Sequence, residues 1–390
     1  MFAVLCALRK ALARATLLAA TLFVAACEPM PAGRAPAIDA EAPVPVALIL
    51  PGGSGNSTDE VLARNLRQAA DLAIADLQGV KIDLRVYNAG ADAATSAAMA
   101  RKAVDEGAKI ILGPVFAEAA NAAGVAVAPA GVNVLSFSNN TDIAGGNVFV
   151  LGPTFQNTAN RLVRFAARAG KGRILIVHDQ NPAGDLGTRA IEAAARRAGA
   201  TVVGKASYPF SQQGVIAAAP QIASQARSAG ATSVFLTADT AGALPLLAQL
   251  LPEAGLSGKT TQFVGLTRWD IPSATLSLPG VQGGWFALPD PGLTAQFQSR
   301  FAAAYGEPPH PIAALAYDGI AAIGALAKSG RADALSASAL TQGSGFAGVS
   351  GVFRLLPDGT NERGLAVAQI ENAQVVVIDP APRSFSGAGF

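Results

Sequence analysis

Few residues of this chain have the types and spacing that catalysis requires. The two histidines, His178 and His310, are far apart, and neither an HExxH nor a GxSxG motif occurs. His178 precedes Asp179, but the sequence offers no nucleophile to match such a base. Two glycine-rich stretches are not phosphate loops, because "PGGSGNST" (51–58) lacks a lysine and "SGKT" (257–260) lacks the preceding glycine. We therefore predict a non-enzymatic protein without a metal or nucleotide cofactor.

Both cysteines, Cys6 and Cys27, lie in an N-terminal segment with the pattern of an export signal. Basic residues precede the apolar run 15–26, whose 12 residues are too few for a membrane-spanning helix. The run ends in Val-Ala-Ala-Cys, which is similar to the bacterial lipobox. We predict a signal peptide over 1–26 and a lipidated Cys27, with a plain cleaved signal as the alternative. The folded body would then contain no thiol, which excludes disulfides and cysteine-ligated metals.

The charge balance gives no reason to expect nucleic-acid binding. Removing residues 1–26 takes three basic residues from a total of 29 Lys and Arg, and none of the 27 Asp and Glu. The remaining chain is nearly neutral, so the basic character belongs to the signal. Residues 28–45 are rich in Pro and Ala and have no apolar periodicity. We interpret 27–45 as a disordered tether.

Strand-like and helix-like segments alternate from Val46 onward, which predicts an α/β fold with parallel sheets. The pattern restarts after "NVFVLGPT" (147–154), so two Rossmann-like lobes are expected. Helices near 294–305 and 311–328 should pack back on the first lobe, and the tail 348–379 should close the second. The expected segments are lobe 1 at 46–150, lobe 2 at 151–282, a return to lobe 1 at 283–335, a return to lobe 2 at 336–379, and a tail at 380–390.

Several stretches occur in an order that resembles a known family. They are "ILGPV", "LSFSNN", the Asp-x-x-x-Gly of "HDQNPAGDLG", "AALAYDG" and the closing segment from "SGVFRLLPDG" to "ENAQVVV". Together they resemble the leucine-binding-protein family of type I periplasmic binding proteins, which are two-lobed receptors with a hinged cleft. The "FSNN" stretch and the lipobox also resemble penicillin-binding protein activator lipoproteins. The family likeness implies crossings between lobes near 148–154, 280–290 and 334–348.

The resemblance places the ligand between loops that follow the strands of both lobes. Amino-acid-binding members hold the ligand carboxylate with hydroxyls and backbone amides, and the ammonium with an acidic side chain. In this sequence Phe116 and Ala117 replace the expected hydroxyls, and Thr267 stands at the acidic position. By position, the predicted ligand-binding residues are Ser54, Pro114, Phe116, Ala117, Ser136, Ser138, Asn139, Asn140, Tyr208, Asp239, Thr267, Trp269 and Asp270.

These departures change the expected ligand. A zwitterion taken out of water needs both charges paired, since an unpaired buried charge costs several kcal/mol. The serines and asparagines of 136–140 could bind a carboxylate or a neutral polar group, and Asp239 or Asp270 could replace the missing acid. Arg268 could pair with a ligand carboxylate or remain an ordinary loop arginine. Asp318 could lie at the rim of the cleft or form a structural bond within its helix layer.

Two functions remain open from the sequence. The first is a lipid-anchored receptor that presents an amino-acid-like or peptide-like ligand to an ABC permease in the periplasm. The second is an activator that docks on a penicillin-binding protein and stimulates peptidoglycan synthesis. Glu28 follows the predicted lipidated cysteine, where Asp would favour the inner membrane, so the outer membrane is favoured in a Gram-negative cell. Of these two hypotheses, we favour the receptor.

Overall fold

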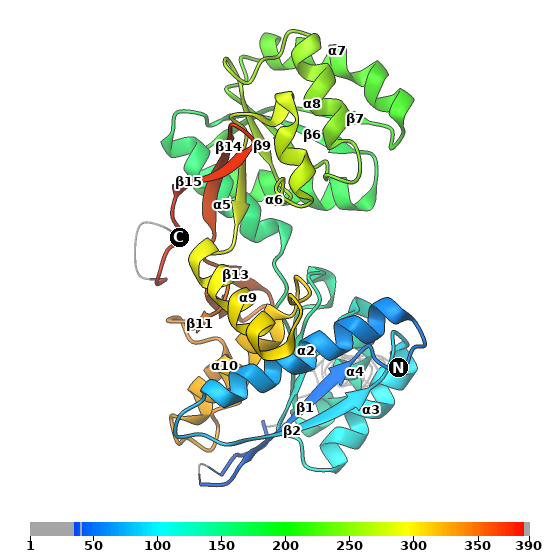
Figure 1. The fold of residues 1–390 in the computed structure, drawn as a ribbon, viewed down its shortest axis with the longest axis vertical. Helices are drawn as coiled ribbons and strands as arrows, with labels where there is room; N and C mark the ends of the chain where they lie inside the picture. The colour runs from blue at the N-terminus through cyan, green and yellow to red at the C-terminus, as the bar shows by residue number, and fades with distance from the viewer. Residues whose placement is uncertain (1–34, 40, 386–390) are drawn as a thin grey trace, which may run out of the picture.

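The first lobe is built on a five-stranded parallel sheet, covered by helices on both faces (Figure 1). A computed structural model describes residues 35–39 and 41–385 of the chain. The strands are β1 (Val44–Leu50), β2 (Ile82–Asn88), β3 (Ile110–Leu112), β4 (Asn133–Ser136) and β5 (Val148–Val150), in the order β2-β1-β3-β4-β5. The helices are α2 (Ser57–Asp76), α3 (Ala93–Asp105), α4 (Ala117–Val127), α9 (Pro291–Tyr305) and α10 (Ala314–Ala327), with short 3-10 turns η2 (Ala128–Ala130) and η3 (Thr141–Ile143).

The alternation of side chains along β1 explains why this lobe has three layers. Val46 and Leu48 belong to the core under α2, α9 and α10, whereas Ala47 and Ile49 belong to the core under α3 and α4. Successive residues of a strand point to opposite faces, so a run of apolar residues is buried on both. The two helices expected near 294–305 and 311–328 accordingly pack on the first lobe. Phe297, for example, lies in the core of that lobe.

The second lobe contains a seven-stranded sheet in the order β15-β14-β10-β9-β8-β6-β7. Its strands are β6 (Arg173–Asp179), β7 (Thr201–Tyr208), β8 (Ser233–Leu236), β9 (Gln262–Gly265), β10 (Trp285–Leu288), β14 (Ala366–Glu371) and β15 (Gln374–Asp379). Only β14 and β15 run antiparallel to their neighbours. Helices α5 (Phe155–Arg168) and α6 (Pro182–Ala198) cover one face, and α7 (Gln212–Ser228) and α8 (Leu244–Glu253) cover the other, with 3-10 turns η4 (Ser273–Ser277) and η5 (Pro279–Val281) after β9.

Helix boundaries follow local chemistry. The Thr154 side chain caps α5, and it forms a reciprocal capping box with Asn157. Helix α6 begins with the Asn181 cap and Pro182, and it ends at Gly199, whose φ of 67° is left-handed. These capping residues therefore determine where both helices begin. In the part of the chain that the structure describes, no helix combines the length and the apolarity needed to cross a membrane.

The chain passes between the lobes after β5, after β10 and after a small antiparallel sheet near the C-terminus (Figure 1). That sheet consists of β11 (Phe346–Gly348), β12 (Gly351–Leu355) and β13 (Asn361–Arg363), and it follows the short helix α11 (Ala337–Leu340). The structure differs from the expected segments at two places. β10 pairs with β9 and β14, so the return to the first lobe begins after Leu288 rather than at 283.

The third crossing comes later than the expected 334–348. Leu340, Phe346 and Phe353 lie in the core of the first lobe, so the chain leaves that lobe only between β13 and β14. The reason is the apolar alternation of β12, in which Gly351, Phe353 and Leu355 are buried. The α/β fold with two lobes and parallel central sheets is confirmed.

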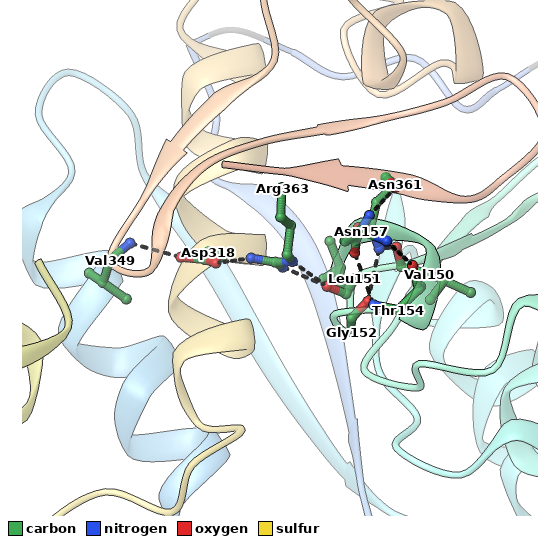
Figure 2. A network of polar contacts seen from close by, with 9 residues as sticks. All are labelled: Val150, Leu151, Gly152, Thr154, Asn157, Asp318, Val349, Asn361 and Arg363. Carbon is green, nitrogen blue, oxygen red and sulfur yellow. Dashed lines mark hydrogen bonds and ion pairs between the residues drawn. The ribbon is translucent and has the colours of Figure 1, made fainter. Parts of the chain in front are cut away.

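A buried polar network joins the first and third crossings (Figure 2). Arg363 of β13 donates from Nε to the carbonyl of Leu151 at 3.1 Å and from Nη1 to Asp318 Oδ2 at 3.1 Å. Asn361 donates to the carbonyls of Val150 and Gly152 at 2.7 and 2.9 Å. Asp318 therefore forms the structural bond that the sequence left as one of two options, and it is fully buried in α10.

Candidate ligand-binding site

The first lobe presents the loops that follow β1, β3 and β4 at one edge of its sheet. Gly113 directly follows β3 with a φ of 91°, and a Cβ at this position would lie 2.2 Å from the carbonyl oxygen of Ile49. Glycine is therefore required for the close approach. The following Pro114, joined by a cis peptide bond, accepts hydrogen bonds at its carbonyl from Ser136 Oγ and Phe137 N, each at 3.0 Å. The loops after β3 and β4 are thus fixed to each other.

The polar residues after β4 mainly hold their own loop. Ser136 Oγ accepts from the Ser138 amide at 3.1 Å, and Ser138 Oγ accepts from the Asn140 amide at 3.1 Å. Asn140 Oδ1 accepts from the Asp142 amide at 2.9 Å. Ser136 is fully buried and already donates to Pro114. The Ser138 hydroxyl keeps a hydrogen to donate, and Asn139 is exposed, so these two have the most capacity left for a ligand.

The other predicted residues of the first lobe are less available. Ser54 Oγ donates to Asp59 Oδ2 at 3.0 Å within the turn before α2. Phe116 is the residue before α4 and makes no side-chain cap, and its ring is 37% exposed. Ala117 is the first residue of α4. This loop therefore offers an apolar ring and backbone amides in place of hydroxyls.

The second lobe has a row of buried polar atoms with few hydrogen-bond partners. Among the described residues, seven buried side-chain N or O atoms lack a well-aligned hydrogen-bond partner, and four of them end or follow adjacent strands. The four are Asp179 Oδ1 at the end of β6, Tyr208 OH at the end of β7, Thr237 Oγ1 after β8, and Trp269 Nε1 after β9. Because parallel strands place their carboxyl ends at one edge, these atoms lie along the same edge of the sheet.

Asp179 and Tyr208 face each other across the β6–β7 register. Burial raises the pKa of the Tyr208 phenol, and a side-chain hydrogen bond with Asp179 and the negative charge of that residue raise it further. The phenol is therefore a neutral donor at all physiological pH values, next to a carboxylate that can accept. Neither Asp179 nor Thr237 is in the list of predicted ligand-binding residues, although Asp179 ends its strand as Tyr208 does and Thr237 directly follows β8.

The acidic residues that could replace the family's missing acid are engaged locally. Asp239 is exposed, and its Oδ1 accepts from the amide of Gly242 in the turn before α8. Asp270 accepts from Arg268 Nε at 2.6 Å, so the arginine pairs within its own loop. Thr267 Oγ1 donates to the carbonyl of Ala238 at 3.1 Å.

Trp269 lies in the core of the second lobe and is fully buried. Its indole occupies the space left by two glycines, since a Cβ on Gly265 or Gly284 would lie 2.2 or 2.3 Å from ring atoms. A ligand contact by this ring, as predicted from the sequence, would need a movement of the loop. Only its Nε1 atom carries an unmet hydrogen-bonding capacity.

Two cavities border these loops. One, of about 700 Å³, lies between the lobes, where Asn139, Asn140 and Asp142 face the start of α5 and one side of α6, including Arg189 and Arg196. The other, of about 480 Å³, lies in the second lobe between the starts of α7 and α8 and is mostly apolar. Its lining includes Tyr208, Phe210, Val215, Leu246 and Leu278. The structure thus brings Asn139 and Asn140 to one cavity and Tyr208 to the other.

Metal ligation has no counterpart in the described ranges. No group of three or more His, Cys, Asp or Glu side chains lies close enough there to hold an ion. His178 Nδ1 lies 3.0 Å from the carbonyl of Asp179, and His310 Nδ1 accepts from the amide of Ile312. The predicted lipidated Cys27 lies outside the described residues.

Comparisons with known proteins agree with this architecture. The sequence model of a family described as periplasmic binding protein matches residues 43–374. A search of curated proteins found no match. A putative branched-chain amino acid ABC transporter from Rhodospirillum rubrum is 18% identical with a TM-score of 0.74, covering 86% of this chain and 100% of its own.

Two further solved structures were determined with ligands. The ABC transporter substrate-binding protein from Desulfitobacterium hafniense, in complex with Leu, is 19% identical with a TM-score of 0.62, covering 86% of this chain and 100% of its own. A solute-binding protein of an ABC transporter from R. palustris, in complex with benzoate, is 18% identical with a TM-score of 0.56, covering 89% and 99%. At these identities the likeness shows the shared fold.

Proposed function

Because the chain belongs to the periplasmic binding protein family, we propose that it is the solute receptor of an ABC-type importer and holds a small polar ligand between its lobes. The cavity of about 700 Å³ between the lobes, where Asn139 and Asn140 face α6, carries this proposal. Polar groups at the carboxyl edge of the second sheet support it, because a buried polar atom without a hydrogen bond costs about 1–3 kcal/mol. Asp179 and Tyr208 pair with each other there, and ligand groups would complete the remaining hydrogen bonds.

The chemistry of the row indicates the ligand class. Tyr208 and Thr237 can donate and the Asp179 carboxylate accepts, whereas Trp269 Nε1 would become available only if its loop moved. A small molecule with both a carboxylate and a donor group, such as an amino-acid-like or peptide-like compound, supplies both partners. The relatives in complex with Leu and benzoate each hold a carboxylate. The chain would be anchored outside the cytoplasm through a lipid on Cys27 and would deliver its ligand to a membrane permease.

Thermal-shift screening of the purified protein tests the proposal. Amino acids, short peptides, aromatic carboxylates and muropeptides are compared, and a ligand at 100 times its Kd should stabilise the protein by about 2.7 kcal/mol. Asp179→Asn should weaken binding of an active ligand roughly tenfold to a hundredfold, because a hydrogen bond to a charged group is lost. Asp105→Asn, at the exposed C-terminal end of α3, serves as the control and should leave binding unchanged.

The activator function is favoured by one observation. Ser54, Asp239 and Asp270 already hydrogen-bond to nearby residues, and Ser136 bonds to Pro114 of the neighbouring loop. This leaves few groups for a small ligand. If no compound shifts the melting temperature while the protein captures a purified penicillin-binding protein, the receptor proposal is wrong and the activator takes its place.

A further inference from the structure

We propose that a small cavity beside the hinge binds a monoatomic anion such as chloride. The cavity measures about 30 Å³. Its polar lining comes from α5 of the second lobe, through Asn157, Asn160, Arg161 and Arg164, and from β13, through Glu362 and Arg363. It therefore lies where the first and third crossings meet, and it is separate from the proposed solute site.

Positive charge exceeds negative charge around this cavity. Asp379 pairs with both Arg161 and Arg168, at 2.9 and 3.0 Å. Asp318 pairs with Arg363, and Glu362 pairs with Arg354. Among the described residues the Arg164 guanidinium has no carboxylate within ion-pair distance, so five arginines share three carboxylates.

The excess charge is that of Arg164, which is half-buried. The guanidinium groups of its neighbours Arg161 and Arg363, each 6% exposed, are already paired with Asp379 and Asp318. Burial lowers the pKa of Arg164, the neighbouring Arg168 and Arg161 lower it further, and Glu362 only partly opposes them. A cation taken from water without a partner is costly, and a bound anion would remove that cost.

The size of the cavity selects among anions. A volume of 10–15 Å³ in this measure holds about one water molecule, so about 30 Å³ accepts a halide ion, whereas phosphate with its four oxygens would extend beyond it. Arg164 would supply the charge and the Asn160 amide nitrogen a further donor. The anion would then contact α5, which follows the first crossing, and β13, which precedes the third. It would stabilise the packing of these two elements next to the Asn157–Asn361 hydrogen bond (Figure 2).

The test measures the melting temperature of the protein while chloride replaces gluconate at constant ionic strength. We expect a saturable rise for the wild type and an apparent affinity lower by about tenfold in Arg164→Gln, the loss of one charge-assisted hydrogen bond. Excess broadening of the ³⁵Cl resonance should be present with the wild type and lost with Arg164→Gln. Circular dichroism checks the fold, and Arg164→Lys, which keeps the charge, should bind with intermediate affinity.

The matched control is Arg101→Gln, because Arg101 is an exposed arginine on α3 outside both this cavity and the cavity between the lobes. It should respond to chloride as the wild type does. An equal chloride response in Arg164→Gln and the wild type would overturn the proposal. So would an Arg164-dependent stabilisation by phosphate that exceeds that by chloride, because the cavity would then have to be larger.

Discussion

The buried ion pair between Asp318 and Arg363 shows how much one residue can matter to this fold. Asp318 is fully buried, and its other carboxylate oxygen accepts from the Val349 amide at 2.9 Å. Burial raises the pKa of Asp318, and Arg363 and the Val349 amide oppose this rise by favouring the charged form. The arginine also lies over the ring of Phe353, 5.1 Å from its centroid. Arg363 therefore compensates a charge that the core could not otherwise hold.

Replacing Arg363 with Met should lower the free energy of unfolding by about 3–5 kcal/mol, the cost of leaving a buried charge unpaired. Urea unfolding at pH 7 measures this change. The control is Arg331→Met, which removes an exposed pair with Asp333 and should change stability little. Equal effects of the two substitutions would contradict the role assigned to Arg363.

At the scale of elements, one carboxylate joins three helices of the first lobe. Asp76 ends α2 and accepts two hydrogen bonds of 2.7 Å from Arg300 of α9, and a further one from Tyr317 of α10. Burial alone raises the pKa of Asp76, but the hydrogen bonds from Arg300 and Tyr317 outweigh it, so the net pKa is lowered. The three helices are therefore joined through the ionised carboxylate, so the contribution of these hydrogen bonds to stability depends on pH.

The sign of that dependence follows from the lowered pKa. The stabilisation should be complete above the pKa of the unfolded carboxyl, about 3.9, and should disappear as the pH falls through the lower pKa of the folded protein. Asp76→Asn should therefore destabilise the protein at pH 7, and its difference from the wild type should shrink towards pH 2–3. Urea unfolding of both proteins across this range checks it, and a pH-independent difference would show that the charge of Asp76 is not involved.

At the scale of the whole molecule, Asn361 links the connections between the lobes. Its side chain donates to Val150 and Gly152 of the first crossing, and its carbonyl accepts from Asn157 of α5 at 2.7 Å. The first and third crossings are therefore bound to each other and to the second lobe. A movement of the lobes relative to each other would therefore have to occur around this fixed point rather than within it.

Asn361→Ala should free the carbonyls of Val150 and Gly152 and speed hydrogen exchange of the backbone amides in residues 150–157. The matched control is Asn147→Ala, because Asn147 donates to the carbonyls of Gly124 and Val132 inside the first lobe, at 3.0 and 2.8 Å. It should cost stability without a selective effect on 150–157. If both variants change exchange in the crossings equally, Asn361 is not the link described above.

Local patterns were enough to predict the two lobes. Apolar strands such as Val46–Leu50 and caps such as Asn181-Pro182 depend on neighbours in sequence, and the order of the motifs placed the strand-end loops. The third crossing could not be predicted in this way. Whether Phe346 and Phe353 join the first or the second core depends on which lobe has space for them. The local sequence around these residues is compatible with either core.

The sequence by itself therefore determined the fold class, the two-lobe repeat and the positions of the strand-end loops, because these follow from side-chain periodicity and short-range backbone chemistry. Only the tertiary structure decided which polar groups in those loops remain available. Asp239 and Asp270 are engaged within their loops, Asp179 and Tyr208 pair across adjacent strands, and Thr237 keeps an unpartnered atom. Hydrogen-bond partners are set by distances between segments far apart in the chain, and these distances exist only once the lobes have folded.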